Sequence, residues 1–405
     1  MLSDMPTTLR VSEPREILSL VPYRLGFRPA ESVVAVSLRA PRGRVGLMMR
    51  IDLDDLAHAE SGPQVARAMV ATLGADGAHS SLLVVYVADD PRVAHAAASS
   101  SVSSSVSNAV SNAVSHYREA AEAPLGPTTV WVVTSTGYLS LDCMHGCCPP
   151  GGRPLQDLES TRVSAHMVLD GQVVVDSRDD LVRFPTIDSE RRRTVARMRR
   201  RWTERAREAH LAGEPAAVRW RRESLAAWRV AVAHTAAVEA GVPVEQPHAP
   251  WGRVEAGLQD VRVRDAVLVA LVPGTGNLAE RSLLGTRPSS EVDAQIGAAI
   301  AKVVSRETGS TPPPEATLLH ERTLEGVVAH GARGAQAPAL TLLGWLAWWR
   351  GDGTRARMLL ERALLDDEDY RLAVLLTATI VAACPPGWAQ RDARWSAGTP
   401  ADHEQ

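Results

Sequence analysis

Short apolar runs alternate with amphipathic stretches along the first half of the chain. Residues 32–38 (SVVAVSL), 81–88 (SLLVVYVA) and 128–134 (TTVWVVT) are short and rich in β-branched side chains, which is typical of buried strands. Residues 45–53 follow an Arg-Gly turn, so we expect them to pair with the first run as a hairpin. A helical pattern at 64–73 separates the strands. Strands that alternate with helices predict an N-terminal layered α/β domain with a mixed sheet.

A serine- and valine-rich segment, residues 99–115, lies between the last two of these strands. Val102, Val106, Val110 and Val114 recur every four residues. A period of four drifts about 40° per step around an α-helix, so the apolar stripe is imperfect. We therefore expect a repetitive insert within a surface helix and not a functional tract.

Strand patterns end near residue 187, and the remainder predicts an all-helical domain. Apolar residues recur there at three-to-four spacing, as in amphipathic helices. The expected helices are 190–210, 216–241, 261–271, 291–306, 314–329, 337–349, 355–365 and 370–382. The last three resemble a tetratricopeptide-type hairpin plus one helix. Because a single such unit cannot bury its own face, a packed bundle is expected. The predicted organisation is an α/β domain at 1–186, a helical domain at 187–385 and a flexible tail at 386–405.

The charge of the chain restricts its partners. With 44 basic and 47 acidic residues, the net charge is 44 − 47 = −3, which does not indicate a general binder of nucleic acid or of acidic membranes. Lys302 is the single lysine, and we attribute the arginine excess first to a GC-rich genome. Nine arginines fall between Arg191 and Arg207, interleaved with glutamates. We expect a solvated helix face there, and nucleic-acid binding through this helix ranks last among the functions considered.

The expected cellular localisation follows from the absence of targeting patterns in the sequence. No apolar run reaches the roughly 18 to 20 residues that span a bilayer. The N-terminus lacks the basic and apolar regions of a signal peptide. Four cysteines in 405 residues do not resemble a secreted disulfide scaffold. A cytoplasmic protein without membrane contact is therefore expected.

The densest chemistry lies in a cysteine-rich loop at 138–155. Cys143, His145, Cys147 and Cys148 fall within six positions, and the Pro-Pro-Gly-Gly run that follows forces a loop. Thiolate and imidazole ligands suit zinc or iron. The Cys-x3-Cys step supplies half of a zinc site, but no second pair appears at zinc-finger spacing. These four residues are the candidate metal ligands, with zinc as the possible cofactor.

Three other interpretations of the cysteine-rich loop stay open. A thiol with a depressed pKa could act as a nucleophile. Two thiols could form a redox-sensitive disulfide, which in the cytoplasm would act as a switch. The cysteines could also be small buried apolar groups, which is their commonest role.

Several motifs together resemble one known family. The segment 18–34 (LSLVPYRLGFRPAESVV), Arg50-Ile-Asp52, the Cys-Cys-Pro-Pro-Gly-Gly-Arg-Pro run that ends at Pro154, Ser164-Ala-His166 and the Leu-Gly-Trp-Leu-Ala-Trp segment starting at Leu343 are similar to the actinobacterial domain of unknown function 4192. The resemblance covers nearly the whole chain and implies no activity. The serine- and valine-rich insert departs from the family pattern.

These observations rank the possible functions. We expect first a partner- or ligand-binding protein that uses the cleft between its two domains for a protein or small molecule. A protein-binding groove on the helices would expose Trp345, Trp348 or Trp349. The alternative is a metal- or thiol-dependent enzyme or redox sensor built on Cys143, His145, Cys147 and Cys148.

Overall fold

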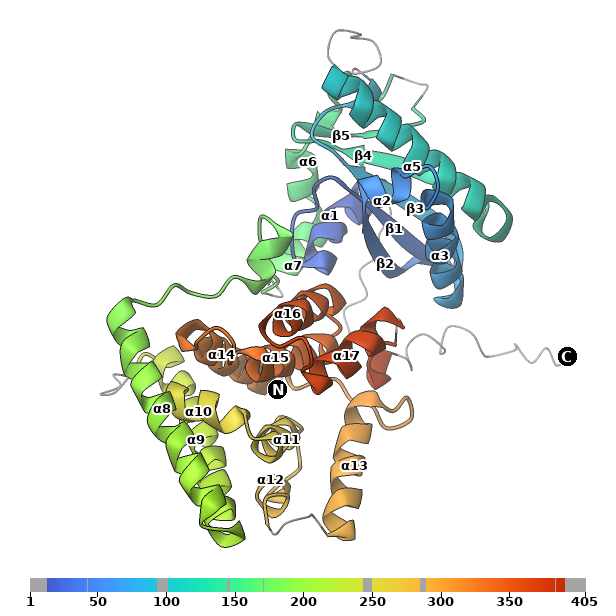
Figure 1. The fold of residues 1–405 in the computed structure, drawn as a ribbon. Helices are drawn as coiled ribbons and strands as arrows, with labels where there is room; N and C mark the ends of the chain where they lie inside the picture. The colour runs from blue at the N-terminus through green and yellow to red at the C-terminus, as the bar shows by residue number, and fades with distance from the viewer. Residues whose placement is uncertain are drawn as a thin grey trace, which may run out of the picture. The chain divides into compact units, whose positions relative to one another are not determined.

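The computed structural model describes residues 13–41, 43–92, 101–143, 146–169, 171–242, 250–284, 289–382 and 384–389, with side chains of the helix that begins at Ser101 described from residue 105. These residues form two compact units, and the boundary between them along the chain lies between Leu181 and Val182 (Figure 1). The first unit holds the sheet and the second is helical. The predicted fold class, a mixed α/β part followed by an all-helical part, is confirmed.

The first unit is built on a six-stranded mixed sheet with the order β2-β1-β3-β4-β5-β6. Its strands are β1 (Ser32–Arg39), β2 (Arg44–Asp52), β3 (Ala78–Tyr86), β4 (Thr129–Val133), β5 (Gly137–Ser140) and β6 (Arg153–Pro154). The predicted β1–β2 hairpin is present, and β1 also pairs antiparallel with β3. Among the described strands, β3 and β4 form the only hydrogen-bonded pair that is parallel. The start of β1 therefore lies at the same sheet edge as the carboxyl ends of β3 and β4.

Helices cover both faces of this sheet (Figure 1). One face packs against α2 (Leu53–Ala57), α3 (Gly62–Ala75) and α5 (Ser101–Leu125), and the other packs against α1 (Pro14–Leu25). The helices α6 (Gln156–Glu159) and α7 (Arg162–Leu169) lie beside α1, and a 3-10 turn, Arg178–Val182, closes the unit. Strand β3 alternates as expected: Leu83 and Val85 enter the α5-side core, whereas Leu82, Val84 and Tyr86 enter the α1-side core.

From Ser101 onward, the serine- and valine-rich segment is helical, as predicted, and forms the first part of α5. The helix is not confined to the surface, because Val110 and Val114 are buried in the sheet core together with Ala113. The serines one position further along face outward or bind neighbouring backbone: the Ser107 hydroxyl donates to the Pro91 carbonyl oxygen at 3.1 Å. The four-residue period thus keeps one apolar side on the core for several turns despite its drift.

The second unit is helical throughout its described length. Its helices are α8 (Ser189–Leu211), α9 (Glu214–Glu239), α10 (Trp251–Leu258), α11 (Val261–Ala270), α12 (Leu278–Arg281), α13 (Ser290–Val304), α14 (Pro314–His330), α15 (Ala337–Trp349), α16 (Gly353–Asp366) and α17 (Arg371–Val381). The helices α8, α11, α13 and α16 each have an N-cap residue whose side chain accepts a hydrogen bond from a backbone N–H of the first turn. This bond satisfies a donor that has no partner within the helix. All thirteen residues of α15 are buried, so this helix is the centre of the unit.

The expected tryptophan groove is wrong for the three residues that were to line it. Trp345, Trp348 and Trp349 are 4%, 6% and 0% exposed. Two of their indole N–H groups also have partners inside the unit: Trp349 donates to Ser310 O at 2.8 Å and Trp348 donates to Cys384 O at 3.0 Å. The physical reason is that α15 is enclosed by its neighbours, so its aromatic residues fill the core.

None of the helices in the described segments combines the length and the apolar character needed to cross a bilayer.

Candidate functional site

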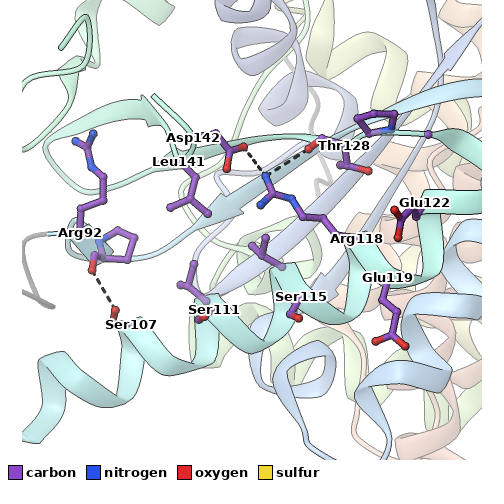
Figure 2. A pocket seen from close by; sticks show the side chains of 15 residues that line it. Arg92, Ser107, Ser111, Ser115, Arg118, Glu119, Glu122, Thr128, Leu141 and Asp142 are labelled. Atoms are coloured by element: carbon purple, nitrogen blue, oxygen red, sulfur yellow. Dashed lines mark hydrogen bonds and ion pairs between the residues drawn. The ribbon is translucent and has the colours of Figure 1, made fainter. Parts of the chain in front are cut away.

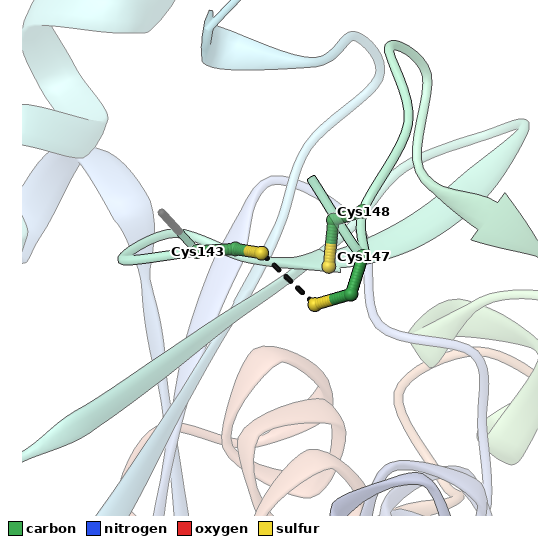
Figure 3. A group of neighbouring side chains, drawn as sticks. All are labelled: Cys143, Cys147 and Cys148. Atoms are coloured by element: carbon green, nitrogen blue, oxygen red, sulfur yellow. Dashed lines mark hydrogen bonds between the residues drawn. The ribbon is translucent and has the colours of Figure 1, made fainter. Parts of the chain in front are cut away.

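The loop after β5 brings three cysteines together (Figure 3). The sulfur atoms of Cys143, Cys147 and Cys148 all lie within 4.8 Å of one another. The closest pair is Cys143 Sγ and Cys147 Sγ, which are 3.0 Å apart. Cys148 is buried against the α5-side core, Cys143 is half-buried and Cys147 is exposed, and none forms a disulfide. The cluster therefore has one anchored thiol and two thiols that can be reached from solvent.

Two arginines hold the cysteine loop, one from the segment after β3 and one from β6. Arg92, which follows β3, donates to the carbonyl oxygens of Cys148 at 3.4 Å and Pro149 at 3.1 Å. Arg153, in β6, donates to the carbonyl oxygen of Cys147 at 3.0 Å. Asp90 in turn holds Arg92 through a two-pronged ion pair, a geometry that fixes a guanidinium in place. The backbone on both sides of the Cys147–Cys148 bond is thereby fixed by positive side chains.

Asp90 also joins the far side of the loop. Its Oδ2 accepts from the Gly151 backbone N–H at 3.2 Å. Burial by itself raises the pKa of this carboxyl, but the hydrogen bonds from Arg92 and Gly151 outweigh that effect and hold the pKa below its usual value. Asp90 is therefore an ionised anchor for the loop at neutral pH.

Glycine is required where the loop returns to the sheet. Gly152 has φ +84°, and a Cβ at this position would stand 2.8 Å from the carbonyl oxygen of Tyr138. Any larger residue would have to push the returning strand away from β5. The Gly-Gly run after the two prolines is thus a requirement of the close approach between β5 and β6.

The protonation of the thiols follows from their contacts. The hydrogen bond with Cys143 is the main cause that raises the pKa of Cys147 above its usual value. A raised thiol pKa leaves little thiolate at neutral pH, which disfavours an unassisted nucleophile. The Ser140 backbone N–H lies 3.4 Å from Cys148 Sγ and donates to it, a contact that suits a sulfur carrying negative charge. The same contact would also suit a thiolate bound to a cation, which displaces the thiol proton.

The structure brings together three of the four predicted ligands. His145 lies outside the described residues. His166, a histidine further along the chain, lies on α7 and is not part of the cluster. Within the described ranges, no other group of three or more His, Cys, Asp or Glu side chains brings its ligand atoms this close together. The hydrogen bonds that Arg92 and Arg153 donate to this loop were not predicted from the sequence. Arg92 is far from the cysteines along the chain and belongs to no motif.

A wide groove in the first unit is lined mostly by polar residues (Figure 2). It has a volume of about 1110 Å³ and runs between α5 and the end of β5. Two of its charged groups are already paired: Arg118 binds Asp142 and also donates to the Thr128 carbonyl oxygen at 3.5 Å. Arg92 and Asp142, at the edge of this groove, adjoin the cysteine loop. None of the three cysteines is among the residues that line the groove, so it touches the cysteine loop only through Arg92 and Asp142.

The basic helix, α8, is partly neutralised by neighbouring carboxylates. Four of its arginines form ion pairs with acidic groups of this unit, namely Arg191 with Asp188, Arg199 with Glu255, Arg205 with Glu223 and Arg207 with Glu204. Three of these partners come from outside α8 itself. This local pairing accords with the solvated face expected from the sequence.

Comparison with known proteins gives one match. The family model described as domain of unknown function (DUF4192) matches residues 14–387. No curated protein and no solved structure gives a match.

Proposed function

The chain belongs to the DUF4192 family, and from its geometry we propose that it binds a zinc ion through the thiolates of Cys143, Cys147 and Cys148. The observation that carries this proposal is the convergence of three sulfur atoms within 4.8 Å. Zinc in proteins is bound at about 2.3 Å from sulfur in tetrahedral sites, which places two thiolates about 3.8 Å apart. The three sulfurs need only small side-chain rotations to reach that geometry.

The surroundings also support a metal. The N–H donor to Cys148 Sγ and the positive Arg92 and Arg153 side chains lower the cost of gathering negative thiolates. The three cysteines leave one coordination position of a tetrahedral ion for a further ligand. Three protein ligands with a water in the fourth position are the arrangement of catalytic zinc sites. Because Cys147 is exposed, that position would be open to solvent.

A dithiol switch is the second candidate, favoured by the 3.0 Å separation of Cys143 and Cys147. Hydrogen peroxide would oxidise one thiol to sulfenic acid and release a water. The other thiol would then attack that sulfur, form the disulfide and release a second water. Two thiols are oxidised and one peroxide is reduced, and reduction by a dithiol restores the pair.

The test is the metal content of the full chain purified without a metal-affinity column. We expect about one zinc per chain. Substitution by cobalt should produce the near-ultraviolet absorption of thiolate-to-cobalt charge transfer. C143S and C147S should each lose the metal, whereas C384S, which removes an exposed thiol of the second unit, should retain it.

Two results would decide against zinc. Equal metal binding by the wild type and the C143S/C147S double variant would remove the site. A metal-free wild type that forms the Cys143–Cys147 disulfide under peroxide, seen by peptide mass mapping, would establish the switch in its place. Binding in a cleft between the two units stays a prediction from the sequence.

A further inference from the structure

A second cavity, of about 460 Å³, lies within the first unit on the α1 side of the sheet. Its walls include α1, the segment before β1 and the segments that follow β3 and β4. The register places these segments side by side, because Tyr86 pairs with Ser32 of β1 and with Val133 of β4. Ligands of open α/β sheets bind at the carboxyl ends of parallel strands. The cavity occupies that position, and its volume falls within the range of small-molecule sites.

Tyr86 supplies an unused polar group to this cavity. It is the last residue of β3, lines the cavity and is only 5% exposed. Its hydroxyl is buried and has no hydrogen-bond partner in the described part of the chain. Burial raises the pKa of Tyr86 far above its usual value, so the hydroxyl keeps its proton. A buried donor without an acceptor destabilises the folded chain, and an acceptor on a bound molecule that reaches the hydroxyl would relieve this.

Backbone strain stands at the rim of the same cavity. Glu31, directly before β1, has φ +41°, which is the left-handed region that non-glycine residues rarely adopt. Its carboxylate accepts from the Ala88 N–H at 3.2 Å and its carbonyl oxygen accepts from the Leu53 N–H at 3.1 Å. These two bonds hold the residue in place and join the β1 and β3 edges. Strain that is maintained in this way is common at binding sites.

The lining determines the chemistry of a ligand. Leu18, Val133, Leu155 and Leu158 form much of an apolar wall around Tyr86. The only basic side chain in the lining, within the described residues, is Arg28, which is 62% exposed and lies 4.0 Å from Asp176. No cation is therefore available beside Tyr86 to neutralise a buried anion, which would be costly to desolvate. The acceptor that reaches Tyr86 must be uncharged.

We infer that this cavity is a binding site for a neutral small molecule with an aromatic or acyl body and a carbonyl acceptor that receives the Tyr86 hydroxyl. The site stands apart from the cysteine cluster and does not depend on metal. Several of its walls come from the segment 18–34, the same segment that carries much of the resemblance to the family. The expected class is an aryl ketone, an amide or an ester, and not a phosphate or a carboxylate.

The test uses two probes that differ only in the acceptor. Para-fluorobenzophenone carries the carbonyl and para-fluorodiphenylmethane has the same two rings without it. Fluorine NMR titration of the full chain should show saturable binding of the ketone. Y86F should weaken ketone binding about fivefold, the effect of losing one hydrogen bond, and should leave binding of the hydrocarbon unchanged.

Two further variants make the result specific. Y117F alters a buried tyrosine on the opposite, α5 side of the sheet and should leave both probes unaffected. A30W places an indole at the exposed mouth of the cavity and should abolish binding of both. The inference is overturned if the wild type shows no saturable binding of the ketone, if Y86F binds it as tightly as the wild type, or if A30W still binds.

Discussion

Glu255 makes the stability of the helical unit depend on pH. This residue of α10 is 3% exposed. Its Oε1 accepts from the Ala332 backbone N–H at 2.7 Å and from Arg199 at 3.4 Å. Burial is the largest influence on this carboxyl and, with a smaller contribution from Asp366, outweighs the two hydrogen bonds and the positive charge of Arg199. Together these raise the pKa of Glu255 from 4.5 to about 7.

The direction and the size of the effect follow from that shift. The folded carboxyl keeps its proton up to a higher pH than the unfolded one, so the folded state binds more protons between pH 4.5 and about 7. Stability therefore falls as pH rises through this window and is constant above it. A difference of about 2.5 pKa units corresponds to roughly 3 kcal/mol. E255Q keeps an acceptor for the Ala332 N–H but cannot ionise, so it should not show this loss.

Urea unfolding between pH 5 and pH 8.5, followed by tryptophan fluorescence, measures this effect. Trp131 is the only tryptophan in the described part of the first unit, so the fluorescence reports mainly on the helical unit. The stability of E255Q relative to wild type should rise by about 2.5 kcal/mol from pH 5 to pH 8.5, because part of the titration of the unfolded carboxyl lies below pH 5. E223Q, which breaks the more exposed pair with Arg205, should shift stability by less than about 1 kcal/mol. Parallel pH profiles for wild type and E255Q would refute the reasoning.

Three further substitutions test contacts within the individual units. G152A should cost about 2 kcal/mol and reduce zinc uptake, because its Cβ would stand 2.8 Å from Tyr138 O; circular dichroism melting and metal analysis measure both. D366A removes the carboxylate that accepts two backbone N–H groups at the start of α15 and should lower the urea stability of the helical unit by about 2 kcal/mol. G344A drives a Cβ to 2.9 Å from Leu360 Cγ between α15 and α16 and should cost about 1–3 kcal/mol in the same assay.

The sequence predicts helices and strands well where one side of an element is apolar. The β1–β2 hairpin, the strands β3 and β4 and most of the helices of the second unit were expected close to their observed positions. Helix α10 was missed because seven of its eight residues are buried. A helix enclosed on nearly all sides shows no apolar stripe, and its two glycines weaken any helical preference. Trp345 and Trp349 were misjudged for the same reason, since α15 is also buried all round.

The proximity of the cysteines could be predicted from the sequence, but the contacts that hold their loop could not. Three cysteines within six positions must lie near one another, so a shared site is a fair inference from spacing alone. The spacing does not reveal that Arg92 and Arg153 hold the loop by its carbonyl groups, because both contacts depend on how β3 and β6 meet it. It also does not reveal that Cys148 is anchored in the core while Cys147 stays exposed.

No motif in the sequence indicates the cavity beside Tyr86. The segment that contains Arg28 and Glu31 precedes a strand, and ligand loops of parallel sheets follow their strands. In this mixed sheet β1 is antiparallel to β3, so a loop that leads into β1 reaches the same edge as loops that leave β3 and β4. The short segment after β3 then serves both sites: Ala88 binds Glu31 at the cavity, and Arg92 holds the cysteine loop. In a mixed sheet, the direction of each strand therefore decides which loops lie together at one edge and can contribute side chains to the same site.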